Sequence, residues 1–110
     1  MTRVLMGDFG ALHRAGLEDI LRVDGIELVE TTAADVIRRL VEVLPDVVVL
    51  DLDQAETPAL VARIVNQFPK VKVLACSSGR PMMCVYPPLH YGEFYLSELD
   101  AALLTSAVQA

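Results

Sequence analysis

Apolar and polar residues alternate in blocks along this chain, and the blocks predict strands separated by helices. Short apolar runs predict strands over 3–8, 26–31, 46–53 and 70–76. Between these runs, apolar residues recur every three or four positions, which is the spacing of an amphipathic helix. Strands that alternate with helices through short joints fold into a parallel sheet with helices on both faces. Residues 1–78 therefore predict a doubly wound α/β fold.

The third predicted strand has the most informative pattern. Its sequence, DVVVLDLD, is apolar at both alternating sets of positions, as expected for a central strand buried on both faces. Pro58 follows it and is suited to the first turn of a helix, because proline needs no intrahelical hydrogen bond there. We expect this strand to lie inside the sheet and to end at Asp51.

The regular alternation stops after Ser78. The segment GRPMMCVYPPLHYGEF contains three prolines and two glycines and has no helical stripe, so the helix expected here is degenerate or missing. Either MMCVY or GEFYL can supply a fifth strand, and the pattern leaves both open. The last helix is expected to follow, with Ser97 as its N-cap.

Length and charge narrow the class of protein. A chain of 110 residues is the size of one domain, here 1–110. Its net charge is −6 and it lacks a basic cluster, which disfavours direct binding of nucleic acid. The sequence lacks a signal peptide and any apolar run of the ~18 residues that span a membrane, so we expect a cytoplasmic protein without membrane contact. Cys76 and Cys84 are too few for a zinc site or a disulfide framework and are expected to be free thiols.

Three oxygen-bearing side chains follow predicted strands. Asp8, Asp51 and Ser77 end the first, third and fourth strands, and ligands of open parallel sheets bind outside these carboxyl ends. Together they could bind a hard cation and let one carboxylate accept a phosphoryl group. Asp53 adds a second negative charge near Asp51, and we expect like charges there to raise a carboxyl pKa.

Two blocks carry a resemblance to a known family. TRVLMGDFGALHRAGLEDIL resembles the opening strand and helix of the receiver domains of two-component response regulators, most closely of the NarL/FixJ type. PDVVVLDLD is similar to the phosphoacceptor strand of that family. The resemblance covers residues 1 to about 78. It implies a flavodoxin/CheY-like sheet of five parallel strands in the order 2-1-3-4-5.

The resemblance assigns a role to each residue of the predicted site. Asp51 falls on the phosphoacceptor position, Asp8 on the second member of the acidic pair that binds magnesium, and Ser77 on the switch hydroxyl. The first member of that pair is Gly7, so a magnesium site made of Asp8 and Asp51 would be weak or vestigial and no cofactor is required. The family's lysine, which pairs with the phosphoryl group, falls on Pro87 or near Leu96, according to which segment forms the fifth strand.

These departures favour an atypical pseudo-receiver that acts in signal transduction through protein-protein interaction, without phosphorylation, enzymatic activity or an output domain. The expected partner is another protein, namely a kinase, a regulator or another signalling partner, or a second copy that forms a homodimer. Methionine and tyrosine are enriched at interfaces, which makes the irregular segment the candidate binding surface. Its predicted contact residues are Met82, Met83, Val85, Tyr86, Leu89 and Tyr91.

Two alternatives follow from the same residues. The first is a phosphorylatable single-domain regulator that accepts phosphate on Asp51 with magnesium at Asp8. The second is a minimal phosphatase, because DLDQ resembles the DxD motif of haloacid-dehalogenase-type enzymes. That family needs a later lysine and a later acidic pair, and residues 78–110 contain no lysine.

Overall fold

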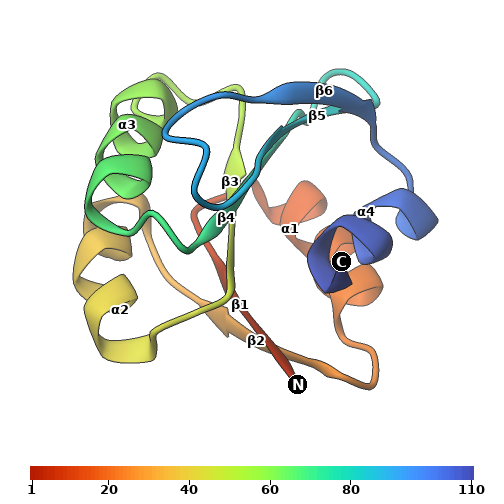
Figure 1. Ribbon diagram of the computed structural model, residues 1–110. Helices are drawn as coiled ribbons and strands as arrows, with labels where there is room; N and C mark the ends of the chain where they lie inside the picture. Colours follow the sequence, from red (N-terminus) through yellow and green to blue (C-terminus); the bar gives the residue numbers. More distant parts are fainter.

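The computed structural model describes residues 1–32 and 34–110 in full and, of Ala33, the backbone alone. Within these residues, six strands form one sheet and four α-helices cover it (Figure 1). The strands are β1 (Thr2–Met6), β2 (Ile26–Glu30), β3 (Val47–Asp51), β4 (Lys72–Cys76), β5 (Met82–Tyr86) and β6 (Tyr95–Glu98). The helices are α1 (Ala11–Leu21), α2 (Val36–Val43), which a short 3-10 helix (Ala33–Asp35) precedes, α3 (Thr57–Gln67) and α4 (Ala101–Gln109).

The sheet combines a parallel half with an antiparallel half. Its strand order is β2-β1-β3-β4-β5-β6, and β1 to β4 run parallel to one another. Strand β3 lies between β1 and β4, and all five of its residues are buried. The α/β class is therefore confirmed, and so is the central place of the third strand.

The chain reverses after β4. Only residues 77–81 connect β4 to β5, whereas parallel neighbours need a crossover of about a dozen residues or more. Strand β5 is accordingly antiparallel to β4, and residues 87–94 reverse the chain again, so that β6 is antiparallel to β5. After two reversals, β6 runs in the same direction as β1 to β4.

The prediction of five parallel strands in the order 2-1-3-4-5 is therefore wrong in its second half. MMCVY and GEFYL were alternative fifth strands, and both segments contribute a strand: MMCVY is β5, and the end of GEFYL begins β6. Ser97 lies within β6 and does not cap the last helix. Asp100 is the N-cap instead, and its carboxylate accepts a hydrogen bond of 2.8 Å from the Leu103 N–H.

Two apolar layers pack on opposite faces of the sheet. Helices α1 and α4 cover one face, where Leu17 and Leu104 join a cluster of strand residues that includes Val49. Helices α2 and α3 cover the other face, where Leu40 and Ile64 pack on a second cluster. Figure 1 shows these two pairs of helices on either side of the strands. Among the described residues, no helix is long and apolar enough to cross a lipid bilayer.

Lys72 attaches the end of α4 to the sheet. Its ammonium group donates hydrogen bonds of 2.7 Å to the Ala107 carbonyl and 3.1 Å to the Ala110 carbonyl. A cation at a helix C-terminus satisfies free carbonyls and interacts favourably with the helix dipole. Partial burial lowers the pKa of Lys72, and these acceptors compensate for part of the lost hydration.

Leu44 ends α2 in a left-handed conformation, with φ at 52°. A leucine in this region brings its Cβ close to a carbonyl oxygen, which glycine avoids. The side chain is 72% exposed, so it contributes little apolar burial in return. The helix end therefore contains avoidable backbone strain.

We predict that Leu44→Gly stabilises the protein by about 0.5–1 kcal/mol, because it removes this strain and exposes no core. Urea unfolding of the variant and the wild type measures the difference in free energy. Leu44→Ala is the matched control, since it truncates the side chain but keeps a Cβ at the same φ. Equal effects of the two substitutions would contradict the backbone explanation.

Candidate functional site

The three residues predicted at the carboxyl ends of the strands all lie there. Asp8 follows β1, Asp51 is the last residue of β3, and Ser77 follows β4. Asp51 and Ser77 are buried, and Asp8 is partly exposed. One end of the sheet therefore collects two carboxylates and a hydroxyl, as the strand pattern indicated.

Local hydrogen bonds hold Asp51 at the start of the β3–α3 loop. Its Oδ1 accepts a hydrogen bond of 2.9 Å from the Asp53 N–H, and its main-chain carbonyl accepts another from the buried Thr57 hydroxyl. The Asp51 side chain thus shapes the turn that carries Asp53. Asp51 is a structural acceptor as well as a candidate nucleophile.

The Asp53 carboxylate bridges from this turn to the loop after β4. It accepts hydrogen bonds of 2.8 Å from the Ser78 N–H and 3.0 Å from the Ser78 hydroxyl. The Ser77 hydroxyl donates to the same carboxylate at 3.0 Å, and the Gly79 N–H lies at 3.4 Å. The Ser77 oxygen in turn accepts hydrogen bonds from the Gly79 and Arg80 N–H groups. One carboxylate therefore organises the reversal between β4 and β5.

These donors set the charge state of Asp53. The Ser78 N–H, the Ser77 hydroxyl and the Ser78 hydroxyl hold the pKa of Asp53 below its usual value. For this carboxylate, the expectation that like charges would raise the pKa is wrong. Asp53 was treated as a neighbour of Asp51, but its side chain is directed to the Ser77–Gly79 loop. The signal in the sequence was the run Ser-Ser-Gly after β4, which is rich in donors for an acceptor in the loop after β3.

Asp8 is already paired with a cation of the chain. The Arg14 guanidinium lies 3.2 Å from its carboxylate, and the Gln54 side chain donates a hydrogen bond of 3.0 Å to its main-chain carbonyl. Magnesium needs oxygen ligands with free lone pairs in octahedral geometry. Within the described residues, no three histidine, cysteine, aspartate or glutamate side chains are grouped so that they could hold a metal ion. Asp8 and Asp51 thus fit a bound magnesium ion poorly.

Gly7 lies against the core and not toward the site. A Cβ at this position would be 3.0 Å from Leu50 Cδ2 and 3.8 Å from Val36 Cγ2. A side chain at this position would crowd Leu50, which belongs to the apolar cluster under α2. An acid at Gly7 therefore requires the Leu50 side chain to shift.

The six predicted interface residues differ in how far they are exposed to solvent. Met83 and Val85 are core residues, 1% and 2% exposed, and their prediction as partner contacts is corrected because they face α1 and α4. Met82 and Tyr86 are partly buried on the opposite face of β5. Leu89 is exposed and Tyr91 is 70% exposed, so these two remain available to a partner.

The two cysteines are free and buried. Burial, with a smaller contribution from the Asp51 carboxylate, raises the pKa of the Cys76 thiol to about 12. Burial also raises the pKa of Cys84. A thiol is nucleophilic only as a thiolate, so neither cysteine is prepared for nucleophilic chemistry at neutral pH.

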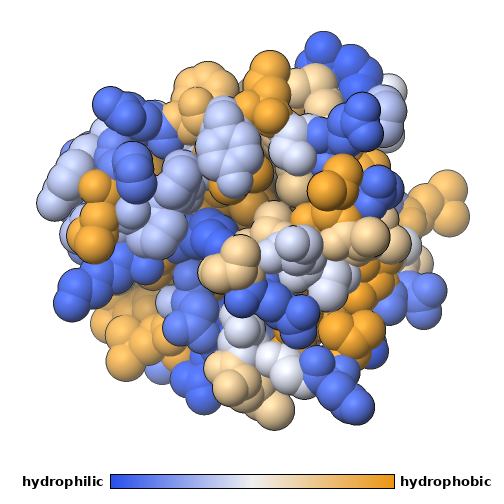
Figure 2. All heavy atoms as spheres, turned by 45° about the vertical axis from the view of Figure 1, so that its right-hand side comes forward, coloured by the Kyte–Doolittle hydropathy of each residue, from blue (hydrophilic) through white to orange (hydrophobic). Residues whose placement is uncertain are grey.

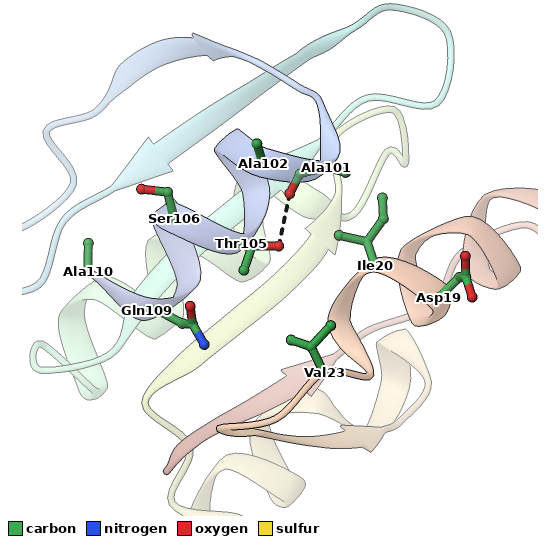
Figure 3. Close-up of a pocket in the computed structure, with 9 residues that line it drawn as sticks. All are labelled: Asp19, Ile20, Val23, Ala101, Ala102, Thr105, Ser106, Gln109 and Ala110. Atoms are coloured by element: carbon green, nitrogen blue, oxygen red, sulfur yellow. Dashed lines mark hydrogen bonds between the residues drawn. The ribbon is translucent and has the colours of Figure 1, made fainter.

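A surface groove of about 880 Å³ lies between α1 and α4 (Figure 3). Its lining residues come from the two helices and from the residues just after them, with Ile20 and Val23 facing small side chains of α4. The Thr105 hydroxyl donates its proton to the Ala101 carbonyl within the same helix, so that proton is not available to a ligand. Figure 2 shows apolar residues between polar ones on this side of the molecule. The groove lacks a group prepared for catalysis.

Comparison with known proteins adds no assignment to this geometry. No protein-family model matches the chain, and no curated protein matches it significantly.

We predict that Asp53→Asn lowers the free energy of unfolding at neutral pH and that the loss disappears in acid. The pKa of Asp53 is lowered in the folded state, so its ionised form stabilises the fold above the ordinary value of 3.8. This stabilisation is lost as the pH falls through the folded-state pKa. Urea unfolding of wild type and variant between neutral and strongly acidic pH measures the difference.

Asp19→Asn is the matched control. Its carboxylate is exposed and makes no hydrogen bond or ion pair with any described residue. We expect this substitution to leave the free energy of unfolding nearly unchanged at every pH. A loss in Asp53→Asn that stays constant with pH would contradict a role for the ionised carboxylate.

We further predict that Gly7→Asp destabilises the protein by about 1–3 kcal/mol, because its Cβ crowds the buried Leu50 side chain, and that it does not create a magnesium site, because Arg14 already pairs with Asp8. Thermal unfolding with and without magnesium chloride measures both effects. Gly16→Asp is the control, since Gly16 is exposed on α1 and a Cβ there meets no atom within 4 Å. A Gly7→Asp variant that magnesium stabilises strongly would overturn this account.

Proposed function

We propose that this protein is a receiver-like signalling domain that works through protein-protein contacts and does not depend on phosphorylation. The resemblance of its first 78 residues to the receivers of response regulators suggests the class. The hydrogen bonds of the Asp53 carboxylate to Ser77, Ser78 and Gly79 support the second part of the proposal, which is independence from phosphorylation. A pseudo-receiver needs its switch loop held by something other than a phosphoryl group, and Asp53 is placed for that role.

Asp53 supports this proposal through the partners it engages. In receivers, the residue at the Ser77 position responds to the phosphoryl group on the acceptor aspartate. Here the Ser77 hydroxyl donates to Asp53, and the Ser78 N–H does the same. A phosphoryl group on Asp51 would compete for these donors and would place new negative charge beside a carboxylate. The Asp53 carboxylate thus takes the place that a phosphoryl group on Asp51 has in receivers.

The reversal after β4 supports the proposal as well. The family's lysine would fall on Pro87 or near Leu96. Pro87 follows β5, whose last residue pairs with Val73 at the opposite end of β4 from Ser77. Leu96 lies two strand spacings from β4, roughly 10 Å, and is neutral. Neither position offers a cation to a phosphorylated Asp51.

The phosphatase alternative is disfavoured by the same network. Its second aspartate would have to act as a general acid, which requires a proton at neutral pH. The donors around Asp53 lower its pKa and keep it ionised. A carboxylate that is ionised and bound by serine donors is suited to hold a loop.

The proposed partner is another protein, and exposed Leu89 and Tyr91 are the contact residues that remain from the predicted set. Both have positive φ, 64° and 50°, which is an uncommon backbone conformation for residues other than glycine. A homodimer is the other candidate complex. Sedimentation of the wild type and of Tyr91→Ser distinguishes the two, because only a dimer that uses this surface changes mass with the substitution.

The direct test is phosphorylation. We predict that incubation with magnesium and acetyl phosphate yields no phosphoaspartate at Asp51, and that beryllofluoride with magnesium causes no change in the amide spectrum around Ser77. Intact-mass spectrometry and two-dimensional NMR measure these outcomes. Asp51→Asn is the control for modification at other residues. A stoichiometric adduct on Asp51 that is absent from Asp51→Asn would overturn the proposal.

A further inference from the structure

The outer edge of β6 is an open edge of the sheet. Strand β6 is last in the order, and β5 is its hydrogen-bonded neighbour on the inner side. The Leu99 N–H donates to the Pro81 carbonyl at 2.9 Å, which places the hydrogen-bonding groups of alternate residues, Tyr95 and Ser97, toward β5. The backbone N–H groups of Leu96 and Glu98 consequently point outward. Neither has a hydrogen-bond partner among the described residues.

This edge lacks most of the features that protect edge strands. Natural edges are protected by short length, lysine, proline, bulges or a covering segment, and of these β6 has only its length of four residues. Tyr95, Leu96, Ser97 and Glu98 include neither lysine nor proline, and the four residues pair with β5 in unbroken register. Leu96 is 62% exposed, and Phe94 and Tyr95 are also exposed. Exposed apolar side chains beside free backbone groups are what an added strand would cover.

The charges near β6 indicate which kind of strand would bind at its outer edge. All nine lysines and arginines lie in residues 1–80, while residues 81–110 carry Glu93, Glu98 and Asp100. These three acidic residues are exposed and flank the edge. If β6 of a second copy bound at this edge, it would bring three more carboxylates to the contact. Its residues 81–110 would supply no lysine or arginine to pair with them. An incoming strand with lysine or arginine would instead pair with the charges present.

We propose that the outer edge of β6 binds an extended segment of a partner protein in which lysine or arginine alternates with apolar residues. Backbone groups of the segment pair with Leu96 and Glu98. Its cations lie on the face that carries Leu96 and Glu98, where they pair with Glu98 and their aliphatic stems cover Leu96, and its apolar side chains lie on the other face beside Tyr95. This inference stands on the sheet edge and its charges, and it does not require the receiver-like assignment.

Fluorescence anisotropy with a labelled peptide of alternating lysine and valine tests the proposal on the whole chain. We expect saturable binding at low salt, weaker binding at raised salt, and little binding of the matched peptide of alternating glutamate and valine. Failure of the lysine peptide to bind would overturn the proposal. Equal binding of both peptides would overturn its charge argument.

Leu96→Pro is the decisive variant. Proline removes an N–H that β5 does not use, so the fold is retained, as thermal unfolding should show. The affinity for the lysine peptide should fall at least tenfold. Leu12→Ala, on an exposed position of α1, is the control and should leave the affinity unchanged. Unchanged binding by folded Leu96→Pro would contradict strand addition at this edge.

Glu98→Lys keeps the proposal testable if Leu96→Pro does not fold, because it leaves the backbone intact. Reversal of one exposed charge should weaken binding of the lysine peptide by about two- to fivefold or more. Improved or unchanged binding would overturn the proposed complementarity. Sedimentation of the wild type and of Leu96→Pro is a separate test. If the wild type is a dimer and Leu96→Pro is a monomer, the strand bound at this edge belongs to a second copy of the protein, and the proposal of a basic partner is overturned.

Discussion

The short connection after β4 is the constraint on which the rest of the structure depends. Residues 77–81 cannot carry a crossover, so β5 must return beside β4 in the antiparallel direction. The Asp53 carboxylate on the adjacent loop provides the acceptor that this tight reversal needs. The second reversal then restores the direction of β6, which allows α4 to pack beside α1 on the same face as in a parallel sheet. One short segment thus decides the second half of the fold.

The short connection between β4 and β5 affects both the candidate site and the open edge of the sheet. Since β5 occupies the place beside β4, β6 becomes the outermost strand and its backbone groups remain open. Since Asp53 binds the Ser77–Gly79 loop, the oxygen-rich end of the sheet is stabilised by a charge that the chain itself supplies. The proposed loss of phosphate chemistry and the proposed gain of a binding edge have a common structural origin. Both depend on the hairpin that joins β4 to β5.

Much of this architecture could be predicted from residue patterns. The runs around Leu5 and Val49 identified buried strands, and Pro58 marked the start of α3, because burial and helix starts have local signatures. Strand direction has no such signature, so both segments after Ser78 could be recognised as strands while the reversal between them was missed. The length of the connection was the available clue. Successive side chains of a strand point to opposite faces of the sheet. This alternation could have predicted that Met83 is buried and that its neighbour Met82 is partly exposed.

The candidate site was predictable in position but not in its contacts. Strand ends placed Asp8, Asp51 and Ser77 together, whereas the direction of the Asp53 side chain depends on a turn that periodicity does not describe. The central claim, reversal after β4, is tested most directly by NMR. Because Ser77 and Met82 form a hydrogen-bonded pair, Cys76 and Met83 form the next, non-hydrogen-bonded pair. The account predicts a strong nuclear Overhauser effect between the Hα atoms of Cys76 and Met83, and the contacts of a parallel β4–β5 pair without that signal would contradict it.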